Sequence, residues 1–128
     1  METKYFEVGD NAWGFILCYD FDYSDSDDIW AICRSFGLSD DKANEAVEVL
    51  ADMNTGMAVS NCDIRMSVVF IGEATDESQW WSTVAHELWH VATAIIDYYG
   101  EDYWKEPAAY LYGELMRMVV SRIAEPCI

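Results

Sequence analysis

Hydrophobic and polar positions divide this chain into segments of different period. A nearly continuous apolar run predicts a buried strand, apolar residues repeating every three to four positions predict an amphipathic helix, and short β-rich runs between turn residues predict further strands. The segments so predicted are a strand at 13–19, helices at 26–36 and about 40–53, strands at 57–61 and 64–71, and helices at about 77–99 and 106–124. The resulting order, β-α-α-β-β-α-α, predicts an α+β fold with a small sheet.

Boundary residues support three of these helices. Ser39 is a favoured N-cap for the helix that begins at Asp40. Asp76, with Gln79 three residues later, is a good start for the long helix, which should end before Gly100. Pro107 suits the first turn of the last helix.

Length and composition predict one domain that spans residues 1–128. A chain of 128 residues that is 52% hydrophobic can bury a core of its own. No apolar run approaches the roughly 18 residues that a membrane-spanning helix needs. The N-terminal segment lacks the basic start and apolar stretch of a secretory signal, so we expect a cytoplasmic protein with no membrane partner.

The charge is strongly one-sided. A formal net charge of −17 repels nucleic-acid backbones and anionic membrane surfaces. The acids gather in the first half of the chain, where we interpret them as a solvated surface. Two other readings stay open: a calcium-binding loop at 20–28, which lacks the glycine and the final glutamate of an EF-hand, and a surface that mimics DNA and occupies a basic partner protein.

The four cysteines show no paired CxxC spacing. Cys18, Cys33, Cys62 and Cys127 lie far apart in the sequence. In an intracellular protein they are expected to be free thiols, three of them in core-like surroundings. Neither a thiolate metal site nor a cysteine nucleophile is favoured.

The only two histidines lie four residues apart in the string His86-Glu87-Leu88-Trp89-His90. This is the HExxH pattern, and on a helix that turns about 100° per residue it places both imidazoles on one face, about 6 Å apart. Glu87 is rotated about 100° from His86, where its carboxylate can act on a metal-bound water as a general base. The pattern therefore predicts a zinc metallohydrolase, and peptide hydrolysis is the usual reaction.

The residues around the pattern leave almost no polar face on this helix. Such a helix is expected to be buried nearly all round, so its two imidazoles and its carboxylate need partners. A metal ion would supply them. The alternative is a pair of ordinary helical histidines with a glutamate between them by chance.

The third ligand must come from outside the pentapeptide. Thr93 and Ile96 stand where the metzincin signature has Gly and then His or Asp, which excludes that class. In glutamate-type zincins the third metal ligand is a glutamate on the following helix. Glu106 is the first glutamate at the start of a separate helix, so we predict that it is the third ligand. Glu114 ranks second, and the remaining competitors are Glu101, Asp102 and Asp97, of which Asp97 lies about 10 Å from His90 along the axis.

His86-Glu87-Leu88-Trp89-His90 followed by Glu106-Pro107-Ala108-Ala109-Tyr110-Leu111-Tyr112-Gly113 resembles the small gluzincin-like metallopeptidase domains of phages, prophages and related bacterial elements. The resemblance covers roughly residues 66–120. It implies a minimal zincin-like fold with a strand edge beside the active helix, a zinc ion, a peptide or protein substrate, and metal roles for His86, His90 and Glu106 with Glu87 as the base. The chain departs from the thermolysin type, which has an aspartate four residues after the ligand glutamate, where this chain has Tyr110.

Tyr110 follows Glu106 by one helical turn and is a candidate to steady the oxyanion, with core packing as the alternative. Further candidates for that role are Tyr98, Tyr99, Tyr103 and Arg65. Two functions from different classes remain. The first is a zinc metallopeptidase, and the second is a nonenzymatic acidic protein that blocks a basic partner and holds any metal structurally.

Overall fold

The computed structural model describes residues 1–9, 12–102 and 105–123. Its described elements form an α+β fold with one mixed four-stranded sheet and four α-helices. In chain order they are β1 (Glu2–Val8), β2 (Trp13–Tyr19), the short 3-10 helix η2 (Tyr23–Asp25), α1 (Ser26–Ser35), α2 (Asp40–Leu50), β3 (Gly56–Asn61), β4 (Met66–Ile71), α3 (Glu77–Tyr99) and α4 (Glu106–Arg122).

The sheet has the order β1-β2-β4-β3, so β1 and β3 are its edges. β1 and β2 form an antiparallel hairpin, β2 and β4 run parallel, and β3 returns antiparallel to β4. The parallel pair needs a long crossover, which α1, α2 and β3 supply. β3 is therefore an edge strand, although it is third among the strands in the sequence.

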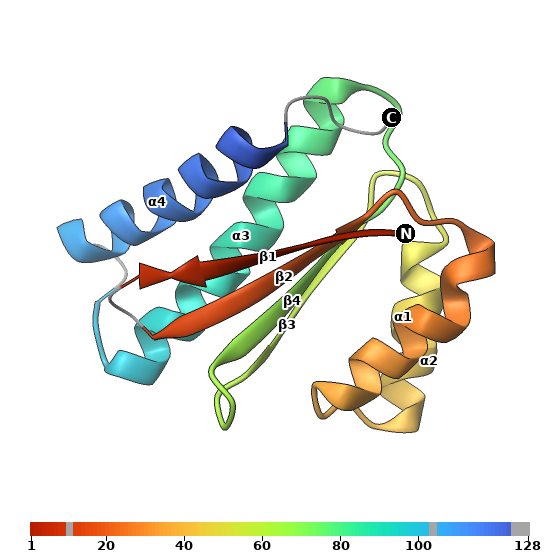
Figure 1. Cartoon of the computed structure of the whole chain (residues 1–128), viewed down its shortest axis with the longest axis horizontal. Helices are drawn as coiled ribbons and strands as arrows, with labels where there is room; N and C mark the ends of the chain where they lie inside the picture. The colour runs from red at the N-terminus through yellow and green to blue at the C-terminus, as the bar shows by residue number, and fades with distance from the viewer. Residues whose placement is uncertain (10–11, 103–104, 124–128) are drawn as a thin grey trace.

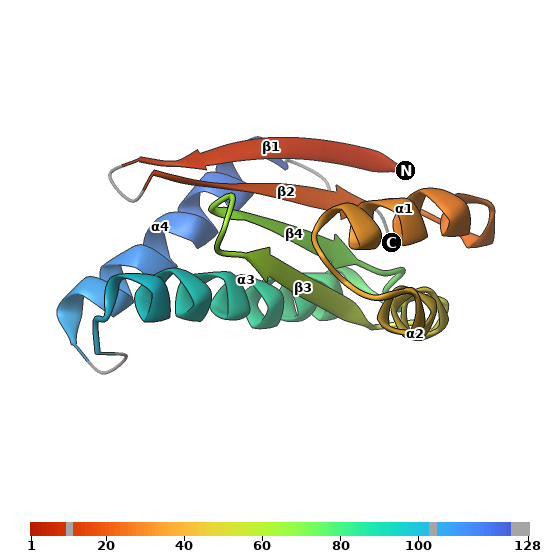
Figure 2. The same cartoon turned by 90° about the horizontal axis from the view of Figure 1, so that it is seen from below.

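Helices cover both faces of the sheet (Figures 1 and 2). On one face, Leu17 and Val69 pack in a core with α3 and α4, while on the other Cys18 and Val68 pack with α1 and α2. Successive side chains of a strand point to opposite faces, so a strand covered on both sides must be apolar at every position. This explains the unbroken apolar runs of β2 and β4.

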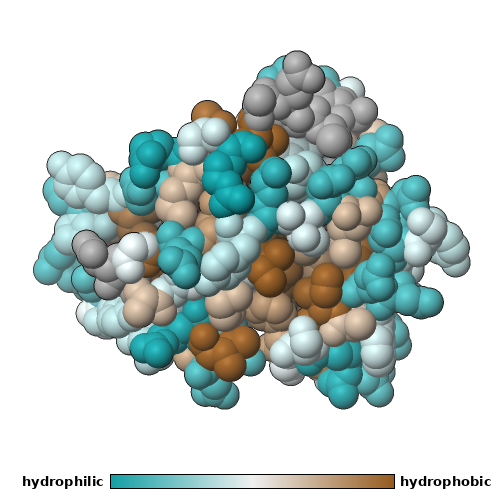
Figure 3. Space-filling model, in the orientation of Figure 1, coloured by the Kyte–Doolittle hydropathy of each residue, from teal (hydrophilic) through white to brown (hydrophobic). Residues whose placement is uncertain are grey.

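One face of the molecule carries both polar and apolar side chains. Figure 3, which views the molecule as Figure 1 does, shows hydrophilic side chains around the edge of this face and hydrophobic ones gathered near its middle. No helix in the described part of the chain combines the length and apolar character that crossing a membrane requires.

The predicted element order lacks β1. Its burial pattern alternates only over its second half, where Phe6 and Val8 are buried between exposed neighbours. β1 is held by pairing with β2 rather than by its own apolar run, so periodicity alone did not reveal it. The predicted end of α2 at Met53 is also wrong, because the helix ends at Leu50.

Candidate metal site

Local signals fix the helix that carries the histidines. The side chain of Asp76 caps the N-terminus of α3 by accepting a hydrogen bond of 2.8 Å from the backbone N–H of Gln79. Gly100 ends the helix in the left-handed conformation, with φ of 70°, where a glycine is favoured. Both ends agree with the sequence prediction, so the register of the HExxH residues on the helix is well determined.

The expectation that α3 is buried nearly all round is wrong. One face packs on the sheet through residues such as Val84 and Leu88, which are fully buried. His86 and His90 lie on an exposed face instead, and 70% of the His86 side chain is accessible. The apolar sequence around the histidines did not predict their exposure, because that exposure depends on tertiary packing. α4 covers one side of α3 and leaves the side that carries the histidines open.

The two imidazoles point toward the same place. Nε2 of His86 and Nε2 of His90 are 3.3 Å apart. Two nitrogens bound to one tetrahedral zinc at 2.0–2.1 Å each would lie about 3.3–3.4 Å apart. The observed distance therefore allows both histidines to bind one zinc ion without rearrangement of either side chain.

Glu87 is the buried member of the group. Its carboxylate Oε1 lies 3.7 Å from Nε2 of His86, whereas Oε2 is buried and has no hydrogen-bond partner among the described residues. Burial raises the pKa of the Glu87 carboxyl, and the neighbouring His86 and His90 act in the opposite direction. A buried carboxylate oxygen without a donor is costly, so this atom needs a water or another donor.

Within the described residues, His86, Glu87 and His90 form a group that could hold a metal ion, with ligand atoms within 4.8 Å of one another. Two nitrogen donors and one carboxylate suit zinc and also other divalent transition metals. The residue types and their spacing thus fit a metal ion, although they do not by themselves select zinc.

Gly56, at the start of β3, lets the edge strand approach this group. A Cβ built at Gly56 would lie 2.7 Å from Cγ2 of Thr83 and 2.8 Å from Cγ of Glu87, closer than real contacts allow. A larger residue would force β3 or the side chains of Thr83 and Glu87 to shift. This role of Gly56 was not predicted from the sequence, where its only signal is a glycine at the start of a β-rich run.

Two open grooves meet at Glu87. One, of about 320 Å³, is lined by His86, Glu87 and the start of β3, and the other, of about 420 Å³, is lined by His90, Glu87 and further β3 residues. Together they run beside the edge strand past both histidines. The candidate metal position is therefore accessible to an extended molecule from either end.

The structure does not bring Glu106 to the histidines. Glu106 is exposed at the start of α4, nine residues before the fully buried Leu115. Nine residues are two and a half helical turns, so the two side chains point to opposite sides of α4. Tyr110 is 74% exposed and lies on much the same solvent side. The roles assigned to these two residues remain predictions.

The other carboxylates proposed as ligands also lie elsewhere. Glu114 accepts a hydrogen bond of 2.9 Å from Nε of Arg117, which lowers the pKa of its carboxyl. Asp102 pairs with Lys105 at 2.9 Å. Asp97 and Glu101 are exposed, and neither belongs to the His86 group.

The alternative oxyanion donors are not assembled around Glu87 either. Tyr98 and Tyr99 are exposed near the end of α3 and contact each other edge to face, with ring centroids 4.9 Å apart. Arg65 lines a separate hollow beside Tyr5. Tyr103 lies outside the described residues.

α4 is oriented by a contact that the sequence did not suggest. The phenol of Tyr112 donates a hydrogen bond of 2.8 Å to the backbone carbonyl of Ala85, and its ring packs edge to face on Trp89. Tyr112 and the buried Leu115 thus turn one side of α4 toward α3 and the core. This is the physical reason why Glu106 faces solvent.

A pair of variants tests the third ligand. Glu106→Gln and Glu114→Gln each remove one carboxylate charge from α4. If either carboxylate is a zinc ligand, its loss should weaken zinc binding by orders of magnitude. Because both side chains lie on exposed positions of α4, we expect both variants to bind zinc like the unmodified protein in a titration with a competing chelator. A selective loss in Glu106→Gln would show that α4 presents this carboxylate to the metal when the ion is bound.

The described cysteines are free thiols. Cys18 and Cys33 are buried, and burial together with the neighbouring Cys33 raises the pKa of the Cys18 thiol to about 12. Cys62 is exposed, and Cys127 lies outside the described residues. A thiol with so high a pKa is a poor nucleophile at neutral pH, so the Cys18 thiol is expected to be unreactive.

Comparison of the chain with models of known protein families, with curated proteins and with solved structures finds no match.

Proposed function

We propose that this chain is a zinc-dependent metallopeptidase with a small zincin-like fold. The observation that carries the proposal is the pair of imidazole nitrogens 3.3 Å apart on an exposed helix face, with the buried carboxylate of Glu87 beside them. The HExxH string at residues 86–90, which resembles that of small gluzincin-like domains, supports the same activity. A nonenzymatic acidic protein has no need for a buried carboxylate oxygen, Glu87 Oε2, that lacks a hydrogen-bond donor at this place.

His86 and His90 would hold the ion through their Nε2 atoms. A zinc ion bound there would polarise a substrate carbonyl and lower the pKa of a water molecule toward about 7. The exposure of both rings leaves the solvent side of the site open to water and to substrate. Tyr110 receives no role in this proposal, because its phenol lies on the solvent side of α4.

Glu87 would accept the proton of the attacking water and pass it to the leaving amine. Its Oε1 faces the histidines at 3.7 Å from His86, which leaves the carboxylate beside the ion rather than remote from it. A carboxylate in this position can act as a general base toward a water molecule bound beside it. Glu87 lines both grooves, as expected for a base that acts on a molecule bound in them.

β3 would orient the substrate. It is an edge strand, so in the described structure one side of its backbone has no strand partner. An extended peptide can add to such an edge through main-chain hydrogen bonds, independently of its side chains. The grooves at Gly56 and Ser60 lie along this edge and meet at Glu87, so a peptide placed there would present a carbonyl to the metal position.

The proposal is tested by zinc-dependent cleavage of a mixed pool of denatured proteins. We expect the zinc-loaded protein to generate new peptide termini, detected by mass spectrometry, and the chelated protein to generate none. Adding back zinc should restore cleavage. A zinc-loaded, folded protein that produces no new termini at equimolar ratio to its substrates would contradict the proposal and favour the nonenzymatic alternative.

A further inference from the structure

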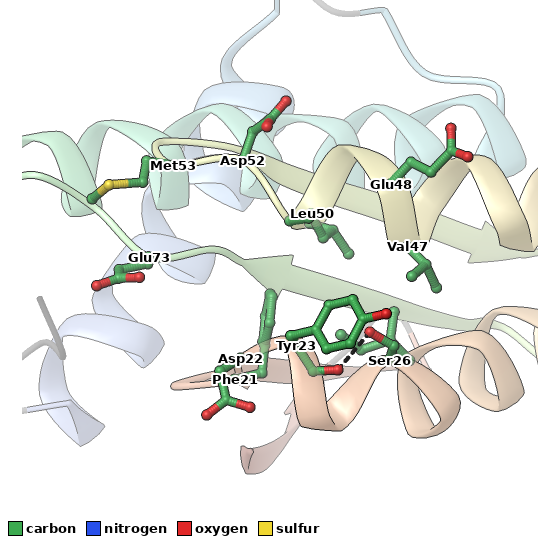
Figure 4. A pocket seen from close by; sticks show the side chains of 12 residues that line it. Phe21, Asp22, Tyr23, Ser26, Val47, Glu48, Leu50, Asp52, Met53 and Glu73 are labelled. Atoms are coloured by element: carbon green, nitrogen blue, oxygen red, sulfur yellow. Dashed lines mark hydrogen bonds between the residues drawn. The ribbon is translucent and has the colours of Figure 1, made fainter.

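Two hollows of similar size differ in what they offer a ligand. One, of about 470 Å³, lies between the start of α1 and the C-terminal end of α2. Its serine, Ser26, donates a hydrogen bond of 2.8 Å to the backbone carbonyl of Tyr23, so this hydroxyl proton is already used (Figure 4). The other is the groove of about 420 Å³ that His90 and Glu87 share with β3, which we call the His90 groove. Its serine, Ser60, is held in a different way.

A chain of hydrogen bonds leads from the core to the His90 groove. Nε1 of Trp13 donates a hydrogen bond of 3.0 Å to Oγ of Ser67, and Oγ of Ser67 lies 2.6 Å from Oγ of Ser60. Ser60 and Ser67 are direct partners in the pairing of β3 with β4. Trp13 and Ser67 are buried, whereas Ser60 is half-buried and lines the groove.

The buried end of this chain sets its direction. An indole N–H can only donate, so the Ser67 oxygen accepts from Trp13. Within the described residues, Ser60 is the one remaining hydrogen-bond partner of the Ser67 hydroxyl. If Ser60 donated to Ser67, the buried Ser67 proton would have no acceptor, which is costly. Ser67 therefore donates to Ser60.

The hydroxyl proton of Ser60 is consequently free for a ligand. Within the described residues, Ser60 makes no side-chain hydrogen bond other than the one with Ser67. Its oxygen is already engaged by the Ser67 proton, so the group that Ser60 still offers to the groove is a donor. The buried chain thus selects a hydrogen-bond acceptor as the ligand of Ser60.

The rest of the His90 groove is narrow in chemistry. Ala58 and Ser60 are two residues apart on β3, so their side chains share the face toward α3. Ala94 follows His90 by one helical turn and shares its face of α3. Ala58 and Ala94 both pack against the core. The groove therefore combines two small apolar walls with one hydrogen-bond donor.

The charge of the site excludes some acceptors. No lysine or arginine lines the His90 groove, whereas Glu87 contributes a carboxylate. The whole chain has a net charge of −17, so an anionic acceptor would be repelled. Asparagine and glutamine combine a neutral carbonyl acceptor with a short methylene stem that suits the apolar walls.

We propose that the His90 groove holds an asparagine or glutamine side chain of the peptide substrate, whose amide carbonyl accepts a hydrogen bond from Ser60. Ser60 is then a specificity-determining residue, and Trp13 and Ser67 are positioning residues that fix the direction of its hydroxyl. The inference rests on the proposed function in one respect, namely that the molecule in the groove is a peptide.

A pair of alternating peptides tests the proposal on the whole metal-free protein, which cannot cleave them by the proposed mechanism. One is (Gln-Ala)4 and the other (norleucine-Ala)4, both blocked at each end and carrying the same uncharged solubilising group. Alternate side chains of an extended peptide share a face, so either peptide can present its long side chain to Ser60 in several registers. Their Kd values are measured by NMR titration.

We expect Ser60→Ala to weaken binding of the glutamine peptide by about three- to tenfold, as loss of one hydrogen bond implies. The norleucine peptide should change by less than about twofold, and Ser60→Thr, which keeps a hydroxyl, should restore the glutamine peptide's affinity. Ser121→Ala removes an exposed hydroxyl of α4 and should leave both Kd values within about twofold. Equal losses for both peptides in Ser60→Ala would overturn the proposal.

The indole N–H of Trp13 gives a readout in the unmodified protein, independent of how the variants fold. Hydrogen bonds in a chain polarise one another, so engagement of Ser60 should shift the NMR signal of the Trp13 Nε1–H at the other end. We expect the glutamine peptide to shift this signal and the norleucine peptide to leave it unchanged. An unmoved Trp13 signal, or no binding of either peptide up to its solubility limit, would also overturn the proposal.

These outcomes are separate from the cleavage test. Zinc-dependent cleavage without any glutamine preference through Ser60 would overturn this inference and leave the peptidase proposal standing. A preference that depends on Ser60, in a protein whose zinc-loaded form cleaves nothing, would support the His90 groove as a peptide site and contradict the peptidase activity.

Discussion

Replacing Glu87 with glutamine is expected to abolish peptide hydrolysis while zinc remains bound. Glutamine has nearly the shape of glutamate but cannot accept the proton of the attacking water, and the imidazoles of His86 and His90 are unchanged. Loss of a general base lowers the rate by about 10²- to 10⁴-fold. Cleavage rate and zinc content, measured on the same preparation, check the prediction.

A neighbouring glutamate supplies the control. Glu77 lies in the first turn of α3 and is exposed, so Glu77→Gln changes the same charge on the same helix away from the site. It should retain both cleavage and zinc. If Glu87→Gln retains the full cleavage rate, Glu87 is not the base, and the proposed mechanism fails even if zinc is bound.

Replacing His90 with alanine is expected to remove zinc binding and activity but to leave the metal-free fold intact. The His90 side chain is exposed, so its truncation should cost little stability when no ion is present. A ligand that binds only the folded state at 100 times its Kd stabilises that state by about 2.7 kcal/mol. Thermal melts with and without zinc should therefore show a rise in Tm of several degrees for the unmodified protein and none for His90→Ala.

Asp97→Asn is the matched control for the histidine variant. Asp97 follows His90 by seven residues on the same helix and was itself a candidate ligand, but it does not belong to the His86 group. Its variant should show the same zinc-induced rise in Tm as the unmodified protein. A zinc-induced rise that survives in His90→Ala would place the ion elsewhere in the molecule.

The sequence predicted local structure well wherever a short-range signal decided it. The N-caps Ser39 and Asp76 begin α2 and α3 as expected, since each side chain accepts a hydrogen bond from a backbone N–H in the first turn. The apolar run at Trp13–Tyr19 forms β2 with the predicted bounds. These features depend on residues close in sequence, which is why pattern alone could identify them.

Features that depend on tertiary contacts were not predicted. β1 is defined by its pairing with β2, and the edge position of β3 follows from a strand order that the sequence does not reveal. The exposure of His86 and His90 depends on where α4 packs, which the hydrogen bond from Tyr112 to Ala85 helps to set. The same orientation turns Glu106 toward solvent, and the spacing of the two helices in the sequence could not predict this.

The candidate site was predicted only in part, because some of its contacts are local in the sequence and others are tertiary. An i, i+4 pair on a helix has a fixed geometry, so the convergence of His86 and His90 followed directly from the sequence. The close approach of Gly56 to Glu87 joins residues 31 positions apart and emerged only from the structure.

Anomalous diffraction at the zinc absorption edge, from crystals of the protein grown with zinc, tests the central claim most directly. We expect one strong peak on the exposed face of α3, about 2.0–2.1 Å from Nε2 of both His86 and His90. The same map would identify any third protein ligand without reference to its sequence position. Crystals grown at saturating zinc that show no peak between these two nitrogens, or zinc bound only elsewhere on the surface, would contradict the account.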